Sequence, residues 1–207
     1  MEKENLAIKL INQITDHAIN GIGPMGSAEK LAEDFLKRSS DKDKCVKRLI
    51  ATQCTKDTIN GFITGIGGLI TLPIALPADM AVSWIVQARM SAAIAHIYGY
   101  DITDDQVKTF VMTTLVGGAI KDALQDVGIK VGQNLSKVLI KKIPAKVLRE
   151  INKRLGIKLL SKAGSKSIIK LTKMVPVVGG FVGAGFNLAS CRIVGSRAKK
   201  LFGESDD

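Results

Sequence analysis

The feature that most constrains the fold is a run of 21 residues without a charged side chain, residues 58–78. The run opens a longer apolar stretch that continues to Tyr100 and contains only two formal charges, Asp79 and Arg89. No other segment could bury as much apolar surface, so we expect the remaining elements to pack around this one.

Glycines and prolines shape the first part of this stretch. Gly61, Gly65 and Gly68 follow one another at intervals of four and three, which places them on one helical face that a second backbone can approach closely. Pro73 and Pro77 interrupt the run. Its length allows a membrane span, whereas its prolines, glycines and threonines favour a buried helical hairpin. We expect the hairpin.

A second uncharged segment lies near the C-terminus, at residues 174–191. It contains Gly179 and Gly183, four residues apart and therefore on one helical face. We expect these two helix-packing glycines to lie against the glycine face of the central stretch, because small residues on both helices allow the backbones to approach.

The spacing of apolar residues predicts an all-α fold, since intervals of three and four recur and alternation by two is nowhere sustained. We expect a compact multi-helix domain with glycine-lined apolar hairpins and a basic amphipathic helix pair, the latter formed around Pro144 and Gly156. Residues 1–40 are expected to form an N-terminal helical appendage, 41–203 the main domain, and 204–207 a disordered acidic tail.

Residues 21–26 match the GxGxxG pattern of dinucleotide-binding proteins. Such a site needs a preceding β-strand, whereas residues 4–20 have helical periodicity, so we interpret the motif as a turn and keep a nucleotide site as the alternative. Ser27, Asp41 and Thr103 each precede an apolar periodic segment and are expected to be helix N-caps.

The net charge of +11 is concentrated in residues 137–173, where Glu150 is the sole carboxylate and lysine outnumbers arginine. A surface of one sign costs self-repulsion, which points to an anionic partner. The dominance of lysine favours diffuse attraction over bidentate recognition of one phosphate. The residues expected to bind a membrane or another anion are Lys142, Lys146, Arg149, Lys153, Lys158, Lys162, Lys166 and Lys170.

Three cysteines, Cys45, Cys54 and Cys191, are an odd number without a CxxC spacing. This pattern argues against a disulfide framework and against a zinc site, and it favours a reducing cytosol. Residues 1–20 are too polar for a secretory signal. We therefore expect a cytoplasmic protein, peripheral to the inner face of the cell membrane.

Catalytic motifs with known mechanics are not found in the sequence, which lacks GxSxG, a P-loop and HExxH. We predict no catalytic residue, no cofactor and no metal. Asp79, Arg89 and His96 are expected to form a buried polar cluster with a structural role. In this cluster Asp79 would accept hydrogen bonds from its own helix turn, and Arg89 would reach a carboxylate on another helix, either Asp122 or Asp126.

Two groups of apolar and glycine-rich motifs carry a resemblance to a known family. The first consists of Gly68, residues 73–76, Pro77, Asp79, Arg89, Ala95 and residues 98–101. The second consists of residues 175–180, Gly183, Asn187, Gly195, Ala198 and Phe202. With these motifs the chain resembles, over roughly residues 45–203, the EcsC family of bacterial proteins, whose founder is encoded beside an ABC transporter. The resemblance implies a helical fold and a membrane context, and it implies no reaction.

Several classes of function remain compatible with the sequence. The lysine-rich block and the apolar hairpins predict a non-enzymatic, membrane-peripheral helical protein that contacts an anionic membrane surface or an acidic protein. A nucleic-acid-binding protein using the same basic face is the first alternative, although residues 137–173 contain no Phe, Tyr or Trp for base stacking. An enzyme centred on Asp79, Arg89 and His96 is the second alternative, and a protein–protein adaptor the third.

Overall fold

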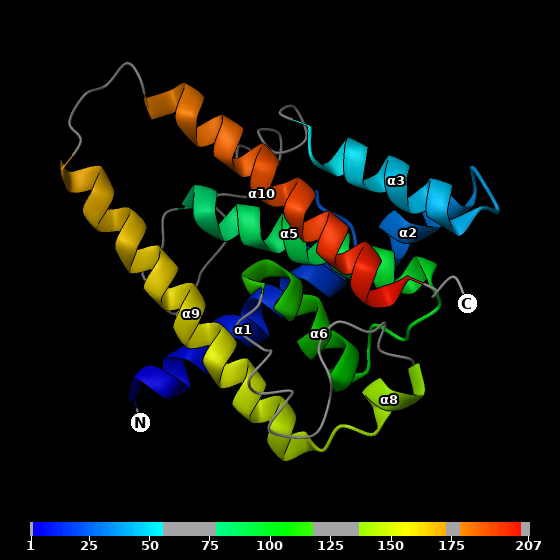
Figure 1. Cartoon of the computed structure of the whole chain (residues 1–207), viewed down its shortest axis with the longest axis horizontal. Helices are drawn as coiled ribbons and strands as arrows, with labels where there is room; N and C mark the ends of the chain where they lie inside the picture. Colours follow the sequence, from blue (N-terminus) through cyan, green and yellow to red (C-terminus); the bar gives the residue numbers. More distant parts are fainter. Residues whose placement is uncertain (1, 56–77, 118–136, 173–178, 204–207) are drawn as a thin grey trace.

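The computed structural model in Figure 1 shows a helical domain. It describes residues 2–55, 78–117, 137–172 and 179–203, and within them all side chains except those of 78–79, 138–139 and 164–187. The helices are α1 (Glu2–Asn20), α2 (Ala28–Leu36), α3 (Lys42–Gln53), α5 (Ala78–Ile97), α6 (Asp105–Val116), α8 (Lys137–Lys141), α9 (Ala145–Thr172) and α10 (Gly179–Phe202). These ranges hold no β-strand, only an isolated bridge between Ile22 and Met25, and the all-α prediction is confirmed.

Helix α5 lies at the centre of the domain, in contact with α1, α2, α3, α6 and α10 (Figure 1). Its described side chains are buried on every side of the helix, among them Val82, Ile85, Met90 and Ile94. A helix that is apolar all round becomes buried by its neighbours, which is why the second half of the central apolar stretch organises the fold.

The other half of the expected hairpin, with Gly61, Gly65 and Gly68, lies outside the described residues. Gly179 and Gly183 belong to α10, but their surroundings also lie outside what the structure describes, so their contact with the first glycine face stays a prediction. Among the described helices we find no candidate for a membrane span.

Helix α1 packs against α9 and α5, and its apolar stripe belongs to the common core. At the α1–α9 contact, a Cβ atom on Gly156 would overlap the backbone carbonyl of Ala7. Helix α9 runs through Gly156 without a break. The expectation that this glycine separates two basic helices is therefore wrong. Glycine serves here to bring two backbones together. Pro144 does lie between α8 and α9, because proline is tolerated before a helix but not inside one.

The GxGxxG motif forms the turn between α1 and α2. Gly21 and Gly23 adopt φ angles of +87° and +54°, and the preceding element is a helix rather than a strand. The turn interpretation is confirmed. Two predicted caps are also present, since the Ser27 hydroxyl accepts from the Lys30 N–H at 3.1 Å and Asp41 accepts from the Lys44 N–H at 3.0 Å.

The start of α6 differs from the prediction. Asp104 occupies the N-cap position, so the assignment of Thr103 to that role is wrong. The Asp101 carboxylate accepts from both the backbone N–H of Thr103, at 2.8 Å, and its hydroxyl, at 2.7 Å. This local turn holds Thr103 outside the helix and lowers the pKa of Asp101.

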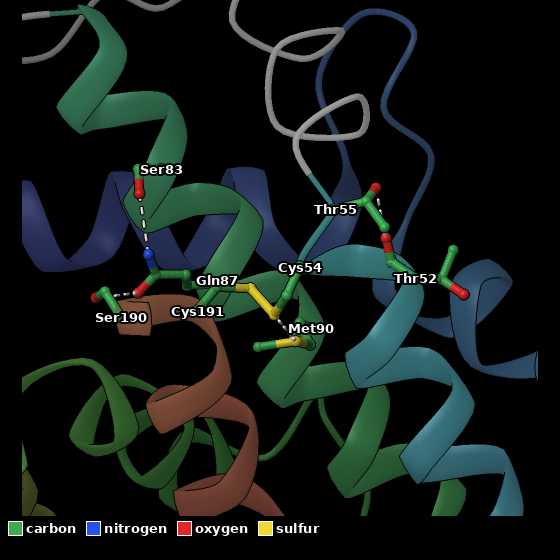
Figure 2. The surroundings of a disulfide bond; sticks show 8 residues. All are labelled: Thr52, Cys54, Thr55, Ser83, Gln87, Met90, Ser190 and Cys191. Carbon is green, nitrogen blue, oxygen red and sulfur yellow. Dashed lines mark hydrogen bonds between the residues drawn. A yellow bond between two sulfur atoms is a disulfide. The ribbon is translucent and has the colours of Figure 1, made fainter. Parts of the chain in front are cut away.

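A disulfide between Cys54 and Cys191 joins α3 to α10, with the two Cα atoms 5.6 Å apart (Figure 2). The sequence-based expectation against a disulfide is therefore wrong. The two cysteines are 137 residues apart, and they meet only because α10 packs along α3. Cys45 remains a buried thiol, with its sulfur 3.2 Å from the carbonyl oxygens of Phe35 and Ser39.

The disulfide lies beside a short polar connection between α5 and α10 (Figure 2). The Gln87 amide donates to the Ser83 hydroxyl at 2.9 Å, and Ser190 of α10 donates to the Gln87 oxygen at 3.5 Å. Cys54 also contacts the sulfur of Met90 at 3.9 Å. These contacts satisfy polar groups in the interior and place α10 against both α3 and α5.

Candidate functional site

Helix α9 follows one edge of the domain, with one side packed on α1 and α6 and the other open to solvent (Figure 1). The buried side contains Leu148, Ile151, Leu155 and Leu159. Its amphipathic character arises from this division, as the apolar residues recur at three and four. The predicted anion-binding cations must therefore be located one by one on the remaining surface.

Four of the predicted cations are exposed and form no ion pair with any described residue. They are Lys142, Lys146, Arg149 and Lys158, which we call the α9 surface. Lys142 precedes α9, while the other three lie on its first half. Because no described carboxylate neutralises them, their charges are available to an anionic partner.

Two other predicted cations have partners within the protein. Lys153 forms an ion pair of 2.6 Å with Glu4 of α1, and this contact raises the pKa of Lys153 and lowers that of Glu4. The Lys162 ammonium lies 3.5 Å from the carbonyl oxygen of Leu115, near the last turn of α6. Cations are favoured at this end of a helix, where carbonyl groups lack partners.

Lys166 and Lys170 belong to α9, but their side chains lie outside the described part. Spacing by four in a helix of 3.6 residues per turn advances about 40° around the axis at each step. The line from Lys158 to Lys170 therefore winds around α9, and it is not parallel to the helix axis as a single ridge would be.

A pocket of about 580 Å³ lies between α1, α6 and the start of α9, and Arg149 lines it. The other charged residues of its lining are Asp16, Asp105 and Lys108. Two carboxylates oppose two cations, so this pocket adds no net attraction for an anion and does not extend the α9 surface.

Two members of the predicted polar cluster, Arg89 and His96, have described side chains, and the cluster itself stays a prediction. Arg89 is buried, with 6% of its surface exposed, and this burial lowers its pKa to about 10, opposed by the charge of Asp34 on α2. His96 is half-buried on the same helix, and the side chain of Asp79 is not among those described. Ten residues of helix separate Asp79 from Arg89 by about 15 Å along the axis, too far for shared chemistry.

The partner of Arg89 was expected on the segment that contains Asp122 and Asp126, which lies outside the described residues. Within those residues, the carboxylate that acts on Arg89 belongs to α2. No group of three or more His, Cys, Asp or Glu side chains within the described ranges is arranged to hold a metal ion.

The structure also brings together cations outside residues 137–173, the segment to which the sequence analysis assigned the net positive charge. Helices α3 and α10 are neighbours, and their basic residues are Lys42, Lys44, Lys47, Arg48, Arg192, Arg197, Lys199 and Lys200. A count of charge for each expected helix would have signalled this set, because α10 contains no carboxylate.

Comparison with known proteins identifies one family. A family model described as the EcsC protein family matches residues 37–203, so α3 and all later helices fall within it and α1 and α2 precede it. No curated protein and no solved structure matches the chain.

Proposed function

This chain belongs to the EcsC protein family, and we propose that it is a non-enzymatic, membrane-peripheral protein whose α9 surface contacts an anionic membrane. The observation that carries the proposal is the exposure of Lys142, Lys146, Arg149 and Lys158, none of which forms an ion pair with a described residue. A protein surface of this kind attracts the negative potential of acidic phospholipids.

Electrostatic attraction must supply most of the adhesion, because the apolar side of α9 is already used by the fold. Each basic side chain near an anionic leaflet contributes about 1 kcal/mol, so the four together contribute about 4 kcal/mol. This free energy corresponds to a dissociation constant of about 1 mM, which describes reversible rather than permanent attachment. Attachment should weaken with salt, as the Debye length falls from about 10 Å at 0.1 M to about 3 Å at 1 M.

Flotation of the protein with vesicles tests the proposal. The wild type should float with vesicles that contain phosphatidylserine and remain behind with vesicles of phosphatidylcholine alone. A variant with glutamate at Lys142, Lys146, Arg149 and Lys158 should lose at least about tenfold in bound fraction. The matched control exchanges each of these lysines for arginine and Arg149 for lysine, and it should float like the wild type.

Lys162 is left unchanged in this variant because its contact with the end of α6 stabilises the fold. A folded glutamate variant that floats as well as the wild type would show that the α9 surface is merely solvated. Tighter binding to duplex DNA than to anionic vesicles would favour the nucleic-acid alternative. Retention by an acidic protein without vesicle binding would favour an adaptor.

A further inference from the structure

A second set of basic residues lies on α3 and on the second half of α10. Helix α3 lies at the edge of the domain away from α9, and α10 runs along α5 beside it (Figure 1). The two helices pack closely, with Gly195 of α10 against the side chain of Ile50 on α3. Lys47 of α3 and Lys199 and Lys200 of α10 line one hollow between the two helices, so basic residues of both helices meet there.

Some of these cations are already bound within the protein. Asp43 accepts from Lys199 at 2.7 Å and from the Tyr98 hydroxyl at 2.6 Å, and these contacts lower its pKa. Lys44 pairs with Asp41 at 3.4 Å, and Arg197 donates to the carbonyl of Thr114 at 3.2 Å.

Three cations of this surface are exposed and make no ion pair within the described ranges. They are Lys47 and Arg48 on α3 and Arg192 on α10, which we call the α3–α10 surface. Asp41 pairs with Lys44 and Asp43 with Lys199. The charge of Lys47 also acts on Asp43, so Asp43 offsets part of the charge of Lys47.

A hollow of about 930 Å³ adjoins this surface, between the start of α3 and the end of α10. Four lysines and two carboxylates line it, so its charge is net positive: Lys42, Lys47, Lys199, Lys200, Asp41 and Asp43, with the hydroxyl groups of Ser40 and Ser196 beside them. Ammonium and hydroxyl groups are the donors that phosphate oxygens accept from, and lysine binds phosphate as a point charge. The hollow thus has the chemistry for one phosphate headgroup.

One apolar side chain stands next to this basic set. Ile193 is 49% exposed, the only large hydrophobic residue so exposed among the residues with described burial, and it follows Arg192 directly on α10. A protein interface has an apolar core enriched in aromatic residues, which a single isoleucine does not provide. Basic residues around an isolated apolar side chain suit the headgroup region of a membrane instead.

We propose that the α3–α10 surface binds the phosphate headgroups of an anionic membrane, so that one molecule bridges two membranes. The bridging part rests on the proposed function of the α9 surface, because it requires both surfaces to bind. Helix α3 and the first half of α9 lie on opposite sides of α5 and α1, so one flat bilayer cannot meet the outer sides of both, whereas two bilayers can.

Clustering of vesicles, followed by light scattering, measures the bridging. The wild type should enlarge the particles of phosphatidylserine vesicles and leave phosphatidylcholine vesicles unchanged. Glutamate at Lys47, Arg48 and Arg192 should reduce clustering at least about tenfold while the α9 surface still floats with vesicles. The matched control, Lys47→Arg with Arg48→Lys and Arg192→Lys, should cluster vesicles like the wild type.

The outcomes separate this inference from the proposed function. If the α9 variant binds normally and the α3–α10 variant does not, the proposed function fails and the bridging fails with it, while the α3–α10 surface is upheld as a membrane site. Clustering by the glutamate variant within twofold of the wild type overturns the inference, as does a wild type that floats with vesicles but never clusters them. Loss of duplex DNA binding but not of vesicle binding in the variant would also overturn it.

Discussion

In both the α1–α9 pair and the α3–α10 pair, a late helix packs against an early one, but the contacts that hold the two helices together differ. Each pair has a glycine of the later helix in its contact, and an ion pair between a carboxylate of the earlier helix and a lysine of the later one. In the first pair, Gly156 meets the backbone of Ala7. In the second, Gly195 meets only the side chain of Ile50, and a disulfide joins the two helices nearby.

This difference shows that a helix contact made through a side chain can be reinforced by a disulfide bond. Backbone atoms cannot move aside without shifting a helix, so the α1–α9 contact depends on glycine itself. The side chain of Ile50 is β-branched and favours one χ1 rotamer in a helix, but it can shift slightly without moving a backbone. The link between Cys54 and Cys191 also holds the α3–α10 pair together. Both pairs leave other cations of the later helix open to solvent.

The largest expected effect comes from removing the covalent link. Replacing Cys54 and Cys191 by alanine should lower the free energy of unfolding by about 4 kcal/mol, because the closed loop of 137 residues restricts the unfolded chain. Urea denaturation under oxidising conditions measures the change. The wild type treated with a reductant should show a similar loss.

Cys45→Ala serves as the control for this experiment, since Cys45 is buried but forms no disulfide. The Cys45→Ala variant should still show a difference in the free energy of unfolding between its oxidised and reduced forms. Equal stability of the wild type with and without reductant would contradict the importance of the link, and the α3–α10 pair would then depend on packing alone.

The two glycines provide the direct comparison of the pairs. Gly156→Ala should destabilise the protein by about 3 kcal/mol, because the new methyl group would overlap the backbone of α1. Gly195→Ala should change stability by less than about 1 kcal/mol, as Ile50 can shift and alanine favours the helix. Thermal and urea unfolding of both variants measure the difference, and equal losses would show that the two contacts are equally rigid.

The smallest effect concerns the ion pairs at low pH. The Lys199 and Tyr98 contacts lower the pKa of Asp43, so their stabilisation is present above the unfolded pKa of about 4 and is lost as the pH falls through the folded value. Because the pair is largely exposed, its contribution should stay below about 1 kcal/mol. Asp43→Asn should therefore flatten the pH dependence of unfolding below pH 4.

Glu33→Gln is the matched control for this titration, since Glu33 is exposed and makes no ion pair with a described residue. It should leave the acid limb of the stability curve unchanged. An Asp43→Asn profile that overlays the wild type would indicate that the Asp43 contacts contribute nothing measurable in solution.

Local sequence rules determined much of the fold. Apolar spacing by three and four predicted the helices, and Ser27, Asp41 and the glycines of residues 21–26 marked helix starts and a turn correctly. These features depend on contacts within about four residues, which a sequence displays directly. The assignment of Thr103 failed even at this range, because its N–H and hydroxyl both bond to Asp101 in a local turn and the helix begins after Asp104.

Contacts between distant residues were decided by the tertiary structure alone. The pairing of Cys54 with Cys191, the close approach at Gly156 and the choice of which lysines remain solvent-exposed all follow from how α9 and α10 pack on earlier helices. Residue spacing specifies the direction of a side chain around its own helix, but not which neighbour that side will meet. The charge of residues 137–173 was therefore evident in the sequence, whereas the α3–α10 surface required two helices more than a hundred residues apart to be brought together.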